Sequence, residues 1–237
     1  MRNMIVRLAL LCFVALLAGG VSAQEKIPEV EKVVPPPSPP SGVDQRTAQV
    51  PVEVLLRFVD EPSHHFGLAR EDFLKKDYAQ SAAEIRKSAG FVKLEMTRSI
   101  GEGQSVLADA AIQLEKLAGN IESGSVKSVD EINMALARAE QALAAHHEMK
   151  AEEYWRANYY TGVGPDLKAA SMSLKNSLKY SGENIDGETD AAMKDADEIG
   201  QKLIEGTKPV DERIGAALEA LGDKIDDAGT KLEQPKK

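Results

Sequence analysis

The fold class is decided by residues 128–147, which read SVDEINMALARAEQALAAHH. Ser128 and Glu131 stand at the spacing of a capping box, in which each side chain binds the other residue's backbone amide at the start of a helix. Behind them, apolar residues recur at spacings of three and four, which is the periodicity of an amphipathic helix: Ile132, Leu136, Ala139 and Leu143. The stretch predicts a long helix with one buried face.

The same periodicity extends toward the N-terminus. No proline falls between Pro62 and Pro165, and Asp77 with Gln80 has the spacing of a second capping box. Short connections between such helices favour antiparallel neighbours. We therefore expect an all-α, up-down-up-down four-helix bundle over residues 47–163. Its expected helices are 50–76, kinked or broken at Pro62, then 78–99, 104–121 and 129–160.

After Gly164 and Pro165 the composition changes, with Tyr180 as the only aromatic residue in 164–237. Proline suits the first position of a helix, so a C-terminal extension of about three amphipathic helices is expected near 166–181, 188–205 and 209–232. The last carries a heptad seam typical of coiled coils: Ile214, Leu218, Leu221, Ile225, Ala228 and Leu232. This seam would pair either with another copy of the chain or with its two neighbouring helices.

The N-terminal residues predict a location outside the cytoplasm. Arg2 and Arg7 precede an apolar run at 8–17, and a small-residue cleavage site ends at Ala23, which together are typical of a secretory signal peptide over residues 1–23. The alternative is an uncleaved membrane anchor. No later segment has the roughly 20 apolar residues of a transmembrane helix. We expect cleavage after Ala23, a periplasmic or secreted protein and no remaining membrane span.

Residues 24–46 contain Pro28 and the run PPPSPP at 35–40. Proline fixes φ and lacks a backbone donor, so it cannot join a helix or a central strand. We expect an extended, disordered linker; the alternative is a proline-rich recognition motif.

Composition excludes several classes of function. With 38 acidic against 29 basic residues the net charge is −9, which argues against nucleic-acid binding. Cys12 is the only cysteine and lies inside the expected signal peptide, so disulfides and thiol chemistry are excluded from the mature chain. No glycine-rich phosphate loop or G-x-S-x-G motif occurs.

All four histidines occur as two adjacent pairs, His64–His65 and His146–His147. In an antiparallel bundle the first and fourth helices are neighbours, and counting residues from their ends places the two pairs within about one turn in depth. Imidazoles that meet inside a bundle can bind zinc or copper. The alternatives are core histidines hydrogen-bonded to carboxylates and a pH-responsive contact.

A second cluster is aromatic and closes the fourth expected helix: Tyr154, Trp155, Tyr159 and Tyr160. Two readings stand: packing against Leu55, Leu56 and Phe58, or a surface for a partner, since such residues are enriched at recognition surfaces.

From the residues alone, the function expected first is an exported helical binding or structural protein without catalytic activity. The second is a periplasmic zinc- or copper-binding bundle that uses the two histidine pairs. The third is an enzyme with an unrecognised site. For partners, we expect another protein or self-association through the C-terminal heptads.

Overall fold

The computed structural model describes residues 52–99 and 102–234, and the expected signal peptide and proline-rich linker lie outside this range. The described residues form helices without strands, so the expected all-α class is confirmed. The helical part, Ala48–Lys237, is one compact unit. Its helices are α1 (Val52–Leu74), α2 (Tyr78–Met96), α3 (Glu102–Glu122), α4 (Val129–Arg156), α5 (Tyr160–Ser181), α6 (Gly187–Ile204) and α7 (Asp211–Glu233).

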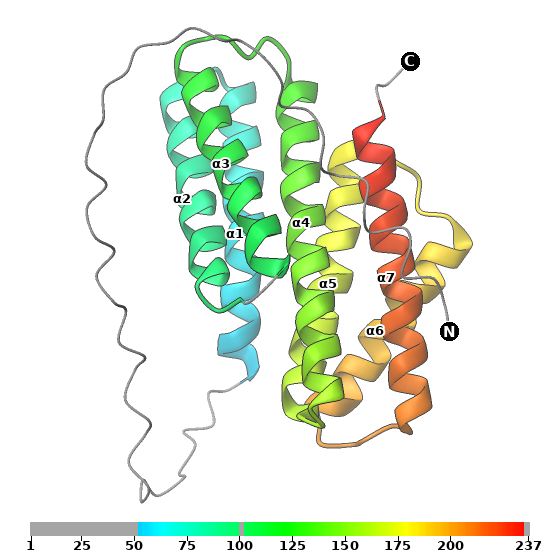
Figure 1. Cartoon of the computed structure of the whole chain (residues 1–237). Helices are drawn as coiled ribbons and strands as arrows, with labels where there is room; N and C mark the ends of the chain where they lie inside the picture. Colours follow the sequence, from blue (N-terminus) through cyan, green and yellow to red (C-terminus); the bar gives the residue numbers. More distant parts are fainter. Residues whose placement is uncertain (1–51, 100–101, 235–237) are drawn as a thin grey trace, which may run out of the picture. The chain divides into compact units, whose positions relative to one another are not determined.

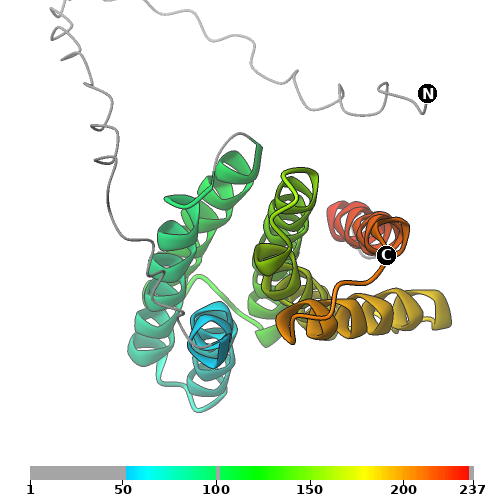
Figure 2. The same cartoon turned by 90° about the horizontal axis from the view of Figure 1, so that it is seen from below.

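Successive helices run in opposite directions, and α6 is tilted against the others (Figures 1 and 2). Helix α4 lies at the centre, with α3 on one side and α5 and α7 on the other, and its most extensive contact is with α5. The bundle-like packing of neighbouring helices therefore continues through the C-terminal helices instead of stopping at α4.

Two apolar clusters meet on α4. The first joins α1, α2 and α3 to the N-terminal part of α4 and ends at Leu143. The second begins at Ala144 and joins the rest of α4 to α5, α6 and α7. The C-terminal helices were expected as a thin extension, but they cover half of α4, because this 28-residue helix is longer than the α2–α3 hairpin beside it.

The helix starts follow the predicted capping chemistry. Ser128 and Glu131 form the reciprocal capping box of α4, and the Asp77 side chain accepts a hydrogen bond from the backbone amide of Gln80 at the start of α2. Each contact satisfies an amide that has no partner inside its helix.

The prolines do not break the helices where the sequence indicated. Pro62 lies inside α1 and Pro165 inside α5. The break expected at Gly164–Pro165 occurs earlier, after Arg156, where Asn158 adopts a left-handed φ of 57°. The chain reverses there, so the expected boundary between residues 163 and 164 falls inside α5.

The predicted heptad seam of α7 is buried inside this single chain, with Ile214 and Leu221 fully enclosed. A second stripe on α7 consists of Gly215, Gly222 and Gly229, spaced seven apart. A Cβ added at these positions would lie within about 3 Å of α4 side chains that are also seven apart: Trp155, Glu148 and Gln141. The glycines thus let α7 approach α4 closely.

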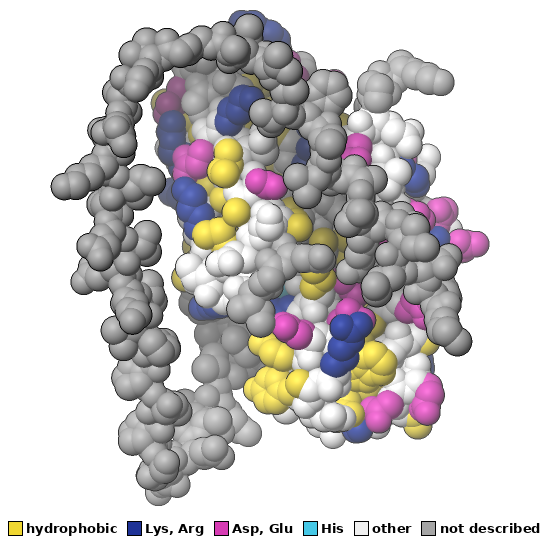
Figure 3. Space-filling model, in the orientation of Figure 1, with side chains coloured by type: hydrophobic (Ala, Val, Ile, Leu, Met, Phe, Trp, Pro, Cys, Tyr) yellow, Lys and Arg dark blue, Asp and Glu magenta, His cyan; other side chains and the backbone are white. Residues whose placement is uncertain are grey.

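Among the described residues, no helix combines the length and the apolar character needed to cross a bilayer. The face seen in Figure 3 mixes acidic, basic and hydrophobic side chains.

Candidate functional site

The first histidine pair lies on α1 and differs strongly between its members. His64 is exposed, whereas His65 is half-buried. The Nδ1 of His65 donates to Glu84 Oε2 on α2 at 2.6 Å, and the ring stacks on Phe91 with centroids 5.6 Å apart. His65 therefore fastens α1 to α2 through a carboxylate and an aromatic face.

Glu84 is buried and accepts three hydrogen bonds. Besides His65, its donors are Lys87 at 2.7 Å and Gln80 at 2.8 Å. Burial raises the pKa of the Glu84 carboxyl, but the hydrogen bonds from Lys87 and His65 outweigh it and hold the pKa below its ordinary value. Glu84 is a satisfied anion within the α1–α2 contact.

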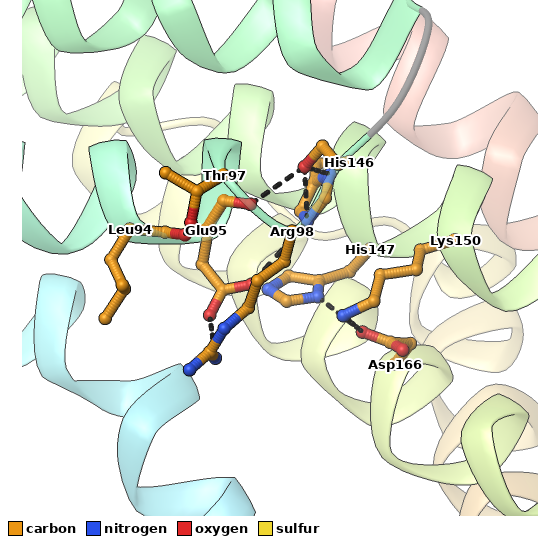
Figure 4. Close-up of polar contacts among 9 residues, drawn as sticks. Leu94, Glu95, Thr97, Arg98, His146, His147, Lys150 and Asp166 are labelled. Atoms are coloured by element: carbon orange, nitrogen blue, oxygen red, sulfur yellow. Dashed lines mark hydrogen bonds and ion pairs between the residues drawn. The ribbon is translucent and has the colours of Figure 1, made fainter. Parts of the chain in front are cut away.

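The second pair, on α4, is almost fully enclosed: His146 and His147 are each 2% exposed (Figure 4). Ser99 Oγ, just beyond the end of α2, lies 3.1 Å from His146 Nδ1, and Glu95 Oε2 lies 3.8 Å from Nε2. The start of α3 comes equally near, since a Cβ at Gly103 would lie 3.2 Å from Nδ1. His146 is thus enclosed between Ser99, at the end of α2, and Gly103, at the start of α3.

His147 faces another helix. Its Nδ1 donates to Asp166 Oδ1 on α5 at 2.8 Å. The same carboxylate oxygen lies 3.4 Å from the ammonium of Lys150, one turn further along α4. Adjacent histidines on one helix therefore contact two different elements, as expected from the roughly 100° that separates neighbours around a helix.

The charges and the burial of this cluster shift the pKa values of two of its groups, Glu95 and His146. Burial by itself raises the pKa of Glu95, but His146 and the positive charges of His147, Lys150 and Arg98 outweigh it and lower the pKa to about 2. Burial lowers the pKa of His146, and the charges of His147 and Lys150 add to this effect, against the opposing influence of Glu95. At neutral pH the cluster therefore contains an ionised Glu95 beside an uncharged His146.

Ser99, His146 and Glu95 supply the residue types of a nucleophile, a base and an acid. The Ser99 hydroxyl donates to the backbone carbonyl of Glu95 at 2.9 Å, and its oxygen lies at similar distances from both nitrogens of His146, 3.1 and 3.5 Å. In a catalytic triad the hydroxyl proton is directed at one imidazole nitrogen. Here the Ser99 oxygen also lies within hydrogen-bond distance of a backbone carbonyl, and the Glu95 carboxylate faces the other imidazole nitrogen, so the three side chains connect α2 to α4.

The structure does not bring the two histidine pairs together. Their carboxylate partners on α2, Glu84 and Glu95, are 11 positions apart, which is about 16 Å along a helix. Among the side chains that the structure describes, no group of three or more His, Cys, Asp and Glu residues is arranged to hold a metal ion. The contacts seen at His65, His146 and His147 are to protein groups.

The aromatic cluster lies where α4 turns into α5. Trp155 is seated over Gly215 of α7, where a Cβ would lie 2.7 Å from the indole ring. Tyr154 and Tyr159 pack edge to face with centroids 5.3 Å apart, and the Tyr160 hydroxyl donates to Asp211 at 2.9 Å. The contacts are thus with α5 and α7, while the side chains of 52–60 lie outside the described residues. Tyr159 is 56% exposed, so a partner surface there stays a prediction.

One surface feature has no counterpart in the sequence motifs: a groove of about 600 Å³ between α3, α4 and α7. Residues of α3, α4 and α7 line it, and we call its α4 side the floor and its α3 and α7 sides the walls. The floor includes three alanines at helical spacing, Ala135, Ala139 and Ala142, and the wall on α3 extends from Val106 to Asn120. Its volume is in the range of ligand-binding clefts.

Sequence reasoning identified the histidines but missed their partners Glu84, Glu95, Ser99 and Asp166. The available signal was position: Glu84 and Glu95 lie on the same face of their helix as the apolar residues Ile85 and Val92. A carboxylate on the buried face of a helix needs a hydrogen-bonding partner, and the buried histidines are such partners.

Comparison of the chain with protein-family models, with curated proteins and with solved structures finds no match.

Proposed function

We propose that this chain is an exported helical binding protein without catalytic activity, and that the groove between α3, α4 and α7 receives an amphipathic helix of a partner protein. The observation that carries the proposal is the groove itself, with its floor of alanines. Small side chains on the floor allow a further helix to approach α4 at the 8–10 Å of ordinary helix packing.

The dimensions of the groove support a helical occupant. The α3 wall, from Val106 to Asn120, is about 21 Å long at the rise of an α-helix. Four turns of a partner helix fit along it, and grooves of this kind read residues at positions i, i+3, i+4 and i+7.

The charges on the rim define the chemistry of the occupant. Lys116 on α3 and Arg138 on α4 are exposed basic residues, with acidic Asp109 closer to the start of α3 and Glu131 closer to the start of α4. Because α3 and α4 are antiparallel, Asp109 and Glu131 belong to opposite ends of the groove. A complementary helix would carry an acidic residue near its centre, basic residues toward its ends and a stripe of small apolar residues.

Export is supported by the sequence of residues 1–23 and by a mature chain without cysteine. The proline-rich residues 24–46 would then separate the helical unit from its N-terminus. The metal-binding and enzymatic alternatives have no comparable support among the described residues.

Site-specific photocrosslinking in the native host tests the binding proposal. A benzoyl-phenylalanine placed at Gln113, an exposed residue of the groove, is expected to yield a discrete crosslinked protein. The same probe at Lys175, exposed on α5, is the matched control and should yield none of it. Ala135→Trp, which fills the floor, should abolish the product. A product that survives this substitution, or that maps to a non-helical segment of the partner, contradicts the proposal.

The exported state is tested separately by N-terminal sequencing of the protein recovered from cell fractions. The expected result is a mature chain that begins at Gln24 outside the cytoplasm. A full-length precursor confined to the cytoplasm would contradict it.

A further inference from the structure

The C-terminal turn of α2 is attached to α4 by a small set of polar contacts. Helix α2 packs mainly on α1 and α3, and its link to α4 runs through Ser99 and Glu95, both of which face His146. All three side chains are at least nine-tenths buried. A change at His146 therefore acts directly on the place where the α2–α3 hairpin meets the rest of the bundle.

The charged groups around His146 come from α2, α4 and α5 and include both signs. On α4 it has His147, with ring centroids 5.0 Å away, and Lys150 one turn further on. From α2 it faces Glu95, whose carboxylate is already engaged by Arg98 at 3.1 Å. From α5, Asp166 is engaged by His147 and Lys150, and Gly103 of α3 lies close to the ring.

We propose that this cluster is a proton-operated latch: protonation of His146 in mildly acidic solution releases the C-terminal turn of α2 from α4 while the other helices stay packed. A second proton on this enclosed ring places a charge next to Lys150 and His147 without access to water. Opening the turn hydrates the imidazolium and separates Ser99 and Glu95 from it.

The direction of the pH effect follows from the linkage between protonation of His146 and opening. Burial holds the pKa of His146 below its ordinary value of 6.5, so the opened state takes up the proton more readily than the closed one. The opened state is therefore favoured progressively as the pH falls below about 6.5. Once His146 is also protonated in the closed state, a further fall in pH no longer favours opening. The latch does not depend on what the groove binds.

Hydrogen exchange of the full chain, followed by mass spectrometry at about pH 7.5 and 5.5, tests the latch. After correction for the chemical exchange rate, peptides within residues 93–99 should lose protection several-fold at the lower pH relative to peptides from α6. His146→Gln should remove this difference between the two pH values. The matched control is His64→Gln, at an exposed histidine on α1, which should keep it.

A second measurement keeps the test decisive where His146→Gln does not fold. Titration of the imidazole resonances of the unmodified protein by NMR is expected to show His146 protonating below pH 6.5. Protonation at or above this value, or equal protection of residues 93–99 at both pH values, overturns the proposal. So does a pH difference that persists in folded His146→Gln.

Discussion

In the first half of the helical unit, α1, α2, α3 and the start of α4 enclose large side chains such as Phe66, Leu107 and Leu136, all fully buried. In the second half, the rest of α4 with α5, α6 and α7 encloses large residues such as Leu167, Leu174 and Ile199, and glycines there bring the helices close together. There a Cβ at Gly164 of α5 would lie 2.8 Å from the carbonyl oxygen of Gly200 on α6. Large apolar side chains fill both halves, and the second half adds close backbone approach at glycines.

This difference explains why α4 cannot be assigned to either half. Its N-terminal part presents aliphatic residues to the first core, and its C-terminal part presents small residues, Ala144 and Ala151, to the second. Between them lie His146 and His147, which bind α2 and α5. The same helix thus serves two modes of packing.

The largest expected effect comes from separating the halves. Truncation after Val163 removes most of α5 and all of α6 and α7, which uncovers Ala144, Ala151 and His147 on α4. We expect the fragment to lose its cooperative thermal transition, measured by circular dichroism, because half of its longest helix loses its core. Deletion of residues 24–46 is the control and should leave the transition unchanged. A fragment that melts cooperatively would show that the first half is an independent domain.

The second largest expected effect on stability concerns Glu95, whose carboxylate faces α4 from α2. Because the pKa of Glu95 is lowered to about 2, its ionised form stabilises the folded state fully above pH 4.5, and this stability is lost as the pH falls toward 2. Glu95→Gln should cost of the order of 3 kcal/mol at pH 7 and little near pH 2, measured by urea denaturation. Glu122→Gln, at an exposed carboxylate paired with Arg86, should have a much smaller effect. A cost that does not vary with pH would contradict this role.

The contrast in packing predicts opposite signs for one kind of substitution. Gly164→Ala, at the close contact of α5 and α6, should destabilise the protein by about 1–3 kcal/mol through overpacking. Gly119→Ala, on α3, meets nothing within 4 Å and should stabilise by about 0.5–1 kcal/mol because alanine favours a helix. Thermal denaturation of both variants measures the difference. Equal signs would remove the proposed contrast.

The smallest expected effect is the change in melting temperature that a metal ion causes through the histidines. Since the histidine pairs bind different carboxylates at different depths, zinc or copper should shift the melting temperature equally in the unmodified protein and in the double variant His65→Ala, His146→Ala. Differential scanning calorimetry over a range of metal concentrations measures this. A stabilisation that only the unmodified protein shows would indicate a shared ion.

The helices could be predicted because periodicity and capping are local. The stripe from Ile132 to Leu143 predicted one buried face of this helix, and all four of its residues are buried. The break near Asn158 was not predicted because the prediction rested on the proline at 165, although a left-handed Asn follows the end of α4 about two turns earlier.

The partners of the histidines could not be predicted because they depend on how helices align. Glu95 is 51 positions from His146, and no local pattern fixes which turn of α2 meets which turn of α4. For the same reason the close contact at the glycines of α7 could not be predicted, because the sequence does not indicate that Trp155 and Gln141 of α4 lie opposite them.

The glycine stripe of α7 also has a consequence for alignment. Because the glycines and their α4 partners repeat every seven residues, sliding α7 by one repeat, about 10.5 Å, would again set glycines opposite large side chains. Shape complementarity along this contact therefore leaves the sliding position undetermined. Directional contacts favour the observed position, in which Tyr160 donates to Asp211, Arg138 to the carbonyl of Leu232 and Gln141 to the carbonyl of Ile225.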